Sequence, residues 1–360
     1  KFIQQDGDRY WIDTSPNLNR TAEDYKESYL RENDDLILEL NTLLEKEGKK
    51  RGNFSGIHSG QVSNSEIPDT PDTRLVLIAA QYSHTRSNDL SDAMKWIKKC
   101  LKNKGNNPRQ FTNTLIFLAP DERNLNNLLV GLAEKKAWQR VINERELLNL
   151  TVNQENQAAT RIENASNTIN LRIKETWSHL IVPYQTEPSS TEPLFDQKLI
   201  NGGKGSLAER ACEKCIQEEL FFVQLGVRLI RDKLNAFLWK SHPHVQVREL
   251  VGWCRKYLYL PRISCDQVIL DSLINPMAAM SGEKTFYLAD SYDDNKRYVD
   301  LRPQQSSSTQ LPSMNSYIVK VDVAEAQISI EKNSFKTANE SEKISQTSSA
   351  SSTIKRGETI

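Results

Sequence analysis

Two titratable residues, His84 and Asp121, each follow an apolar stretch, at a spacing that could bring them together. His84 comes shortly after the apolar run 74–80, and Asp121 follows the run 112–119 and Pro120. In an open α/β sheet ligands gather at the carboxyl ends of the strands, so parallel strands would place both side chains at one edge. These residues are therefore candidates for a catalytic edge, although a loop histidine and a helix-capping aspartate are also common without any function.

The segment 202–206, which reads Gly-Gly-Lys-Gly-Ser, comes nearest to a phosphate-binding loop. A Walker A loop needs Gly-x-x-x-x-Gly-Lys-Ser/Thr after a buried strand, so that backbone N–H groups and the lysine converge on phosphates. Here Lys204 is followed by Gly205, Lys198 stands in place of the first glycine, and the flanking sequence is polar. The sequence therefore favours a flexible loop and gives no cofactor-binding residue in the chain.

Cys212 and Cys215 form a lone Cys-x-x-Cys pair in a segment with helical spacing. A structural zinc site needs a second such pair or two well-spaced histidines, and the nearby His242 and His244 are separated only by Pro243. We therefore favour two half-buried thiols on a helix and predict no metal site. The five cysteines, an odd number, resemble no disulfide framework and indicate a reducing cytoplasm.

Basic residues precede a helix that could serve in nucleic-acid recognition. A winged-helix module would place the second helix of its pair, here 265–273, in the major groove of DNA. That segment contains Asp266 and Asp271 and no lysine or arginine, so phosphates would meet like charge there. Four basic residues before it could contact the nucleic-acid backbone: Arg248, Arg255, Lys256 and Arg262. The last three are the candidate nucleic-acid contacts, but the acidic helix favours a role in protein contacts or packing.

The elements that must position these residues form a parallel α/β unit. The continuous apolar runs 74–80 and 112–119 are typical of strands buried on both faces. A helical pattern over 89–102 lies between them, which predicts a right-handed parallel βαβ crossover. The short apolar run 180–183 is expected at an edge of the same sheet.

Long helices surround this unit. An early helix is predicted to begin at Pro16, with Thr14 or Ser15 as its cap, and to continue to about Glu47. After a loop over 48–71 and the βαβ unit come two further helices, one capped by Asp121 with a break near Asn149, the other over 154–179. The fold class is therefore α/β plus mostly helical, with a parallel βαβ unit and long helices.

The second half of the chain is predicted to hold a different module. Helical patterns are followed by a hairpin with strands over 284–289 and 297–301, an order typical of a winged helix. Ser, Thr, Gln and Lys dominate from 303 onward, apart from an apolar patch at 317–323, which predicts a disordered tail. We expect four parts: 1–184, an α/β and long-helix region; 185–205, a linker; 206–302, a helical and winged-helix-like module; and 303–360, a largely disordered tail.

Composition narrows the class of protein. The chain has 360 residues, and its 47 Lys and Arg balance 47 Asp and Glu. A basic footprint over the whole chain, as expected for a dedicated nucleic-acid-binding protein, is absent. No apolar run approaches the roughly 20 residues that span a bilayer. We expect a cytoplasmic protein without a membrane partner.

Several blocks together resemble one family. They are 9–20, which begins Arg-Tyr-Trp-Ile-Asp, the strand 74–80, the run 111–121 with Asn-Thr-Leu-Ile-Phe-Leu-Ala-Pro-Asp, and 257–262, Tyr-Leu-Tyr-Leu-Pro-Arg. In this order they look like the carboxy-terminal half of a bacterial family of large P-loop ATPases, catalogued as domain of unknown function 499. The resemblance runs from about Asp6 to Leu301.

The resemblance implies an ATP-binding parent whose nucleotide site, with ATP and Mg, lies upstream of Lys1. Family members are often encoded beside DNA methyltransferases in loci that look like phage-defence systems. The family's P-loop has no counterpart in these residues. The expected partners are therefore the ATPase region upstream and possible further subunits or a methyltransferase system.

The resemblance raises the hypothesis that an arginine of this chain acts in trans, because one ATPase subunit can project a guanidinium onto the γ-phosphate of a neighbour. Four arginines lie at the ends of predicted elements: Arg9, Arg20, Arg86 and Arg123. Most arginines in such places are surface or capping residues, and the sequence does not rank the four.

Three functions are therefore open. The first is the non-catalytic carboxy-terminal part of a large P-loop ATPase, which regulates the ATPase or couples it to partners, in the setting of phage defence. The second is a nucleic-acid-binding winged-helix module. The third is an independent enzyme that uses the strand edge at His84 and Asp121.

Overall fold

The computed structural model describes most of the chain. The described residues are 17–49, 51–86, 88–240, 242–274, 285–304 and 311–334, with the backbone of 2–6 and 9–13. Two compact units are present: the first contains Lys1–Val223 and Cys254–Cys265, the second Gln224–Trp253 and Asp266–Ile360. The chain thus leaves the first unit after Val223 and comes back to it over Cys254–Cys265, which we call the return segment.

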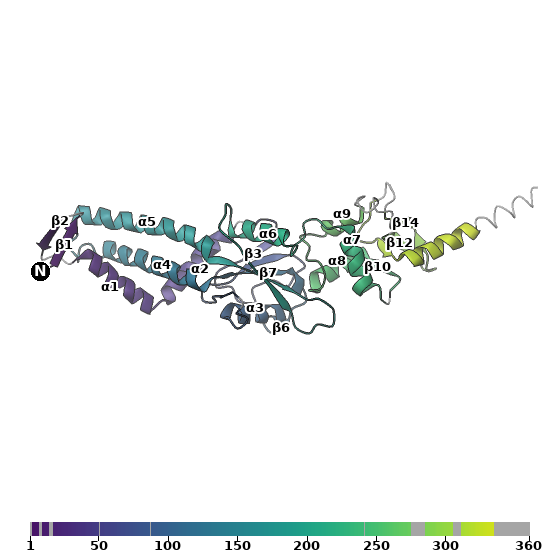
Figure 1. Cartoon of the computed structure of the whole chain (residues 1–360), viewed down its shortest axis with the longest axis horizontal. Coiled ribbons are helices and arrows are strands. Elements are labelled where there is room, and N and C mark those ends of the chain that lie inside the picture. The colour runs from purple at the N-terminus through teal and green to yellow at the C-terminus, as the bar shows by residue number, and fades with distance from the viewer. Residues whose placement is uncertain are drawn as a thin grey trace, which may run out of the picture. The chain divides into compact units, whose positions relative to one another are not determined.

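The first unit is built on a five-stranded mixed sheet with the order β3-β4-β7-β8-β9 (Figure 1). β3, β4 and β7 are parallel, whereas β8 is antiparallel to β7 and β9 is antiparallel to β8. α3 (Asp92–Lys102) connects β4 to β7, so the predicted parallel βαβ unit is confirmed. The strands are β3 (Gly56–His58), β4 (Arg74–Leu77), β7 (Leu115–Pro120), β8 (Trp177–Tyr184) and β9 (Leu194–Leu199).

Both faces of this sheet are covered, which explains why its inner strands are continuously apolar. On one face Leu75 and Ile116 pack in a core that includes residues of four helices: α2 (Asp34–Glu47), α4 (Glu122–Asn143), α5 (Val152–Thr176) and α6 (Leu207–Gln217). On the other face Val76 and Phe117 pack against the apolar side of α3. All six residues of β7 are buried. Because side chains alternate along a strand, the two cores are separate layers around one sheet.

The first of the two later long helices begins at its predicted cap, and the second begins two residues before its predicted start. Asp121 caps α4 (Glu122–Asn143), and its carboxylate accepts a hydrogen bond from the backbone N of Asn124 at 2.9 Å. Thr151 and Gln154 form a capping box at the start of α5 (Val152–Thr176). α4 packs along α5 on one side and along α1 (Leu18–Arg31) on another (Figure 1).

The predicted early helix is two helices. α1 is capped by Asn17, whose side chain accepts hydrogen bonds from the backbone N of Asn19 and Arg20, and α2 (Asp34–Glu47) starts after a break. The predicted cap, Thr14 or Ser15, and the predicted first residue Pro16 lie outside the described residues. Ahead of them, the backbone of β1 (Phe2–Asp6) and β2 (Arg9–Asp13) forms an antiparallel hairpin.

Two predicted boundaries were wrong. The segment 185–205, predicted as a linker, contains β9, which pairs with β8 along its whole length. β9 is an edge strand, where half-exposed polar side chains are tolerated, and these hid it in the sequence. α5 ends at Thr176 because the following residues join β8, so 180–183 lies in an inner strand rather than at the edge.

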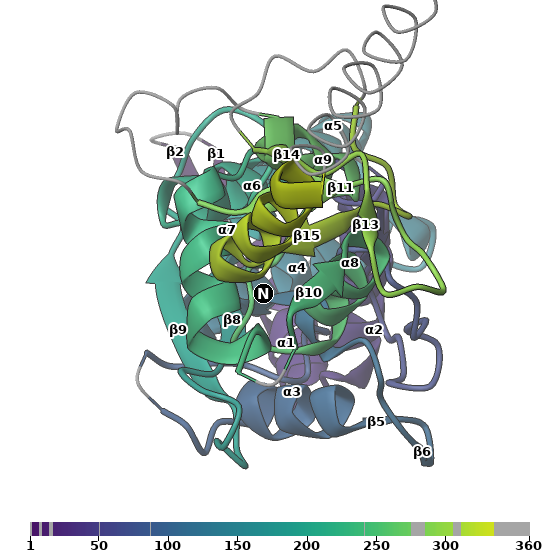
Figure 2. The ribbon, with the colours of Figure 1, turned by 90° about the vertical axis from the view of Figure 1, so that its right-hand side faces the viewer.

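The second unit contains helices and small antiparallel sheets, but the predicted hairpin of 284–289 with 297–301 was wrong, because β11 pairs with β14 and β15 while β13 pairs with β12. Its helices include α7 (Val227–Lys233), which continues into the π-helical turn η2 (Leu234–Leu238), and α9 (Gln267–Ile274). The part of α8 (Val247–Lys256) that ends at Trp253 also belongs to this unit. A four-stranded antiparallel sheet has the order β10-β15-β11-β14, and β12 pairs with β13 in a hairpin (Figure 2). These strands are β10 (His244–Gln246), β11 (Tyr287–Ala289), β12 (Ser291–Tyr292), β13 (Tyr298–Val299), β14 (Arg302–Pro303) and β15 (Tyr317–Val319).

Part of the predicted tail is structured. β15 pairs with both β10 and β11, and a helix follows over residues 321–334. Val319 and Ala324 are buried with Tyr287 and Tyr298, so the apolar patch at 317–323 completes a small core. The predicted disorder of 335–360 lies outside the described residues.

Replacing Trp177 by Phe tests how much the buried indole and its hydrogen bond stabilise the first unit. Trp177 is fully buried, and its indole N–H donates to the carbonyl of Ile78 at 2.8 Å. Trp177→Phe leaves that buried carbonyl without its donor and opens space, so we expect the free energy of unfolding to fall by about 2 kcal/mol. Urea denaturation measures the change. Leu147→Ala, at an exposed position, is the control, and an equal effect of the two variants would contradict the account.

Candidate functional site

The structure brings His84 and Asp121 together at the carboxyl edge of β4 and β7. The two residues form a parallel bridge, in which His84 N donates to Pro120 O at 2.9 Å and Glu122 N donates to His84 O at 3.1 Å. The predicted juxtaposition of His84 and Asp121 is therefore confirmed, and it follows from the parallel pairing of the two strands.

The imidazole of His84 is held at both nitrogens. Nδ1 lies 2.7 Å from Ser91 Oγ, and Nε2 lies 3.1 Å from Gln197 Oε1. Gln197 is itself oriented, because its Nε2 donates to Asp89 Oδ1 at 3.2 Å. A carbonyl oxygen only accepts, so Nε2 of His84 carries the proton and Nδ1 accepts from the Ser91 hydroxyl. The ring is fully buried, and this desolvation lowers the pKa of His84 below its usual value, with a smaller contribution from His179.

His179 completes the cluster and was missed in the sequence. Its Nε2 donates to Asp121 Oδ2 at 3.1 Å, and its ring meets the ring of His84 edge-on, with centroids 4.8 Å apart. The predicted helix over 154–179 concealed it, because that assignment placed residue 179 in a helix and not in a strand of the sheet. Its place directly before the apolar run 180–183 was the available signal for a strand.

Asp121 serves as a cap as well as a partner of His179. One carboxylate oxygen accepts from Asn124 N and the other from His179. Burial opposes ionisation, but these hydrogen bonds and the nearby imidazole outweigh it and lower the pKa of Asp121. The carboxylate is thus ionised and occupied on both oxygens at neutral pH.

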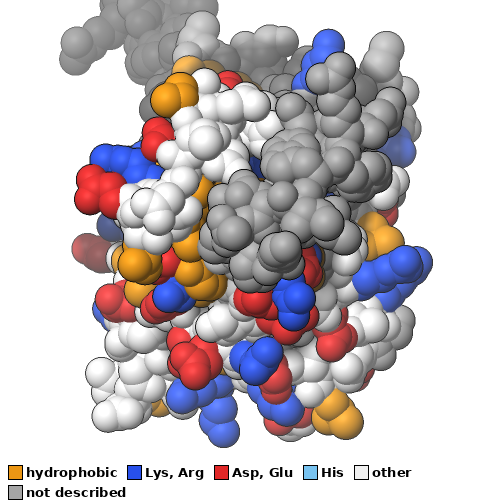
Figure 3. All heavy atoms as spheres, turned by 90° about the vertical axis from the view of Figure 1, so that its left-hand side faces the viewer, with side chains coloured by type: hydrophobic (Ala, Val, Ile, Leu, Met, Phe, Trp, Pro, Cys, Tyr) orange, Lys and Arg blue, Asp and Glu red, His pale blue; other side chains and the backbone are white. Residues whose placement is uncertain are grey.

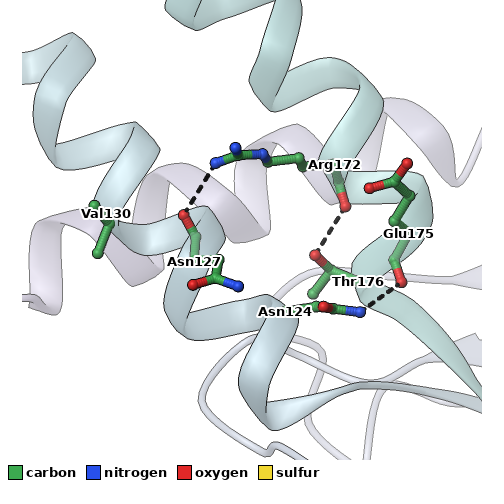
Figure 4. A pocket seen from close by; sticks show the side chains of 6 residues that line it. All are labelled: Asn124, Asn127, Val130, Arg172, Glu175 and Thr176. Atoms are coloured by element: carbon green, nitrogen blue, oxygen red, sulfur yellow. Dashed lines mark hydrogen bonds between the residues drawn. The ribbon is translucent and has the colours of Figure 1, made fainter.

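Two cavities lie next to this edge, at the start of α4. One of about 300 Å³ is lined by Thr85, Asp121, Glu122, Arg123, Asn126 and Asn127. The other, of about 370 Å³, lies between α4 and α5 and is lined by Asn124, Asn127, Val130, Arg172, Glu175 and Thr176 (Figure 4).

The second cavity is walled by groups that already bond to one another. Arg172 Nη1 donates to Asn127 O at 3.5 Å, Asn124 Nδ2 donates to Glu175 O at 3.4 Å, and Thr176 Oγ1 donates to Arg172 O at 2.8 Å (Figure 4). These contacts pin α5 to α4. The cavity offers amides and one guanidinium, which can bind a polar ligand, and no cysteine or serine nucleophile lines it.

The candidate nucleic-acid contacts separate into two kinds. Arg255 and Arg262 are buried, at 4% and 5% exposed, whereas Lys256 is exposed. Arg262 donates to three backbone carbonyls: Nε to Asn113 at 3.0 Å, Nη1 to Leu220 at 3.1 Å and Nη2 to Pro183 at 2.7 Å. Its guanidinium therefore serves the packing of the first unit, and burial lowers its pKa only to about 10, which leaves it charged.

Arg255 has a similar internal role. Its Nη1 donates to Thr73 Oγ1 at 3.0 Å and to Ile263 O at 2.7 Å, and Thr73 Oγ1 donates to the same carbonyl at 2.8 Å. Thr73 immediately precedes β4, so this bond fixes the return segment at the amino end of that strand. Of the three candidate contacts, Lys256 alone is placed to meet a partner on the surface.

The glycine-rich segment 202–206 follows the edge strand β9 and leads into α6. Ser206 caps α6, and the carboxylate of Glu209 accepts from the backbone N of Ser206 at 2.7 Å. That carboxylate occupies the helix end where a phosphate would bind in a P-loop.

Cys212 and Cys215 are both buried and free on α6. Desolvation raises the pKa of both thiols, that of Cys215 to about 12, so they are protonated and unreactive at neutral pH. Within the described residues, no group of three His, Cys, Asp or Glu side chains is placed to hold a metal ion.

Three of the four arginines considered for action in trans have described side chains. Arg20, Arg86 and Arg123 are exposed, and Arg123 lines the smaller cavity beside Asp121. The side chain of Arg9 lies outside the described residues.

Comparison of the chain with protein-family models, with curated proteins and with solved structures finds no match. Among the described residues, no helix is both long enough and apolar enough to cross a membrane.

The lowered pKa of His84 predicts a pH-dependent stability. The unfolded state binds the proton more readily than the folded state, so stability is fully present above the ordinary histidine pKa of about 6.5 and is lost as the pH falls below it. Replacement by Gln removes this titration. Urea denaturation between pH 7.5 and 4.5 should therefore show a smaller loss of stability in His84→Gln than in the wild type, by up to about 1.4 kcal/mol per pH unit. Parallel profiles would contradict the assignment.

Proposed function

We propose that this chain is the non-catalytic carboxy-terminal region of a large P-loop ATPase and that it couples the ATPase to partners, in the setting of phage defence. The observation that carries the proposal is the anchorage of the return segment on the sheet. This segment holds Tyr257–Arg262, one of the sequence blocks that carry the resemblance.

Two of these blocks are joined by hydrogen bonds although they lie far apart in sequence. Asn113 Nδ2 donates to Cys254 O at 2.8 Å and to Leu260 O at 3.1 Å, while Arg262 Nε donates back to Asn113 O. Thr112 Oγ1 donates to Lys256 O at 2.6 Å. Residues of two of the blocks that carry the resemblance therefore meet in one structural joint, as expected if the family's signature preserves this joint.

The course of the chain gives the joint a coupling role. The second unit begins after Val223 and is interrupted by the return segment, so the two units are linked by three covalent connections. The carboxyl end of the return segment is held by Phe222: Phe222 N donates to Arg262 O at 2.9 Å, and Ser264 N donates to Phe222 O at 2.9 Å. A displacement of the second unit would therefore act on the amino ends of β4 and β7, through Thr73 and Asn113.

The two rival functions depend on residues whose side chains form internal hydrogen bonds in the structure. At the strand edge the side chains of His84 and Asp121 already form hydrogen bonds with neighbouring residues of the first unit. In the nucleic-acid hypothesis, Arg255 and Arg262 are engaged inside the first unit. These observations favour the coupling role over an independent enzyme and over DNA contacts made by those arginines.

The test uses the complete reading frame that contains this chain. We expect it to encode a P-loop and to hydrolyse ATP, whereas the 360 residues alone do not. In the complete protein Arg262→Gln should change the maximal hydrolysis rate at least about fivefold while nucleotide affinity stays constant, because it disturbs coupling and not the nucleotide site.

Arg145→Gln, at an exposed arginine of the same unit, is the matched control. If Arg262→Gln fails to fold, as judged by circular dichroism, Thr112→Val is the milder variant, because it removes one bond to the return segment. A reading frame without a P-loop, or ATP hydrolysis by the 360-residue chain, would overturn the proposal.

A further inference from the structure

A third cavity, away from the strand edge, has a strongly one-sided charge. It measures about 600 Å³ and lies in the first unit at the carboxyl end of α3, against the loop between β8 and β9 and the start of Tyr257–Arg262. Four lysines and one glutamate are among its lining residues: Lys98, Lys99, Lys102, Lys256 and Glu192. Its volume is typical of a ligand-binding pocket.

The lysines of this cavity lack acidic partners. All four are exposed, and within the described part of the chain none of them forms an ion pair with a carboxylate. Lys99 and Lys102 lie in the last turn of α3, where positive charge also offsets the partial negative charge of a helix end. That effect does not account for Lys98, in the preceding turn, or for Lys256, which comes from another segment.

An aromatic pair adds a second kind of contact. Tyr257 lines the cavity and is 41% exposed, which is high for a large ring, and it stacks on Tyr259 with centroids 5.4 Å apart and planes at 14°. Beside it, Lys256 Nζ lies over the ring of Phe111, 5.7 Å from its centroid. One ring is therefore braced from behind by another while part of its surface is open to a ligand.

We propose that this cavity binds single-stranded nucleic acid. Such sites combine positive charge that follows the phosphates with aromatic rings on which bases stack. Lys98 and Lys102 lie one turn apart on α3, about 6 Å along the axis, and can meet different phosphates of one strand. An unpaired base can stack on Tyr257, whereas the bases of a duplex are covered by their neighbours.

The positive charge is concentrated at this cavity and is not a property of the whole chain. The chain as a whole is neutral, and on the face shown in Figure 3 acidic and basic side chains are interspersed. A concentration of lysines without carboxylate partners around a single concave site is therefore a feature of this cavity and not of the composition. Glu192 also lines the cavity, and because its negative charge repels phosphates, the strand is expected to follow the lysines.

The lysines are tested by fluorescence anisotropy with labelled fifteen-nucleotide oligo-dT and oligo-U. The variant Lys98→Ala/Lys99→Ala/Lys102→Ala should weaken binding at least tenfold and reduce the slope of log affinity against log salt by about 2, since each lost phosphate contact contributes about 0.7. Lys46→Ala/Lys95→Ala/Lys204→Ala removes the same charge from exposed positions outside the cavity and should leave both quantities nearly unchanged. The two oligonucleotides show whether DNA or RNA is preferred.

The stacking platform is tested separately. Tyr257→Ala should weaken binding about tenfold, whereas Tyr257→Phe, which keeps the ring, should bind like the wild type. A blunt duplex of the same length should bind more weakly than the single strands at about 0.15 M salt. Absence of binding, equal effects of the two triple variants, equal affinity for the duplex, or no effect of Tyr257→Ala would overturn the proposal. None of these outcomes depends on ATP hydrolysis, so this site and the coupling role fail independently.

Discussion

The buried guanidinium of Arg262 is the interaction on which the rest of the first unit depends. It supplies donors to carbonyls from three separate parts of the chain, at Asn113, Pro183 and Leu220. A buried charge is tolerable only when its hydrogen-bonding groups are matched, and backbone carbonyls provide the matching oxygens here. One side chain therefore fixes the entrance to β7, the end of β8 and the return of the chain from the second unit.

Different side chains form the hydrogen bonds at the two ends of the parallel strands. At the amino ends, arginines of the return segment bond to Thr73 and to the backbone before β7. At the carboxyl ends, the cluster of His84, His179 and Asp121 is satisfied by its own hydrogen bonds. Because the groups at both ends of these strands are engaged in internal hydrogen bonds, the cavity beside α3, with its four lysines and one glutamate, is a separate site.

The sequence predicted those parts of the fold that depend on local pattern. Continuous apolar runs gave β4 and β7, and a capping aspartate gave the start of α4. β9 was missed because an edge strand needs no continuous apolar run, and His179 was missed because helical spacing extended past the real end of α5. Whether an arginine lies on the surface or bonds to distant carbonyls, as Arg255 and Arg262 do, depends on tertiary contacts that spacing does not encode.

Native-state hydrogen exchange tests the central claim, that the return segment is part of the sheet's cooperative unit, most directly. The amides to follow are those of Phe222 and Ser264, which bond across the return segment, and that of Ile78, which bonds to Leu118 O in the sheet. The account predicts that all three exchange with the same free energy of opening and the same response to denaturant. Exchange of Phe222 and Ser264 at a clearly lower free energy than Ile78 would contradict it, because the return segment would then open without the sheet.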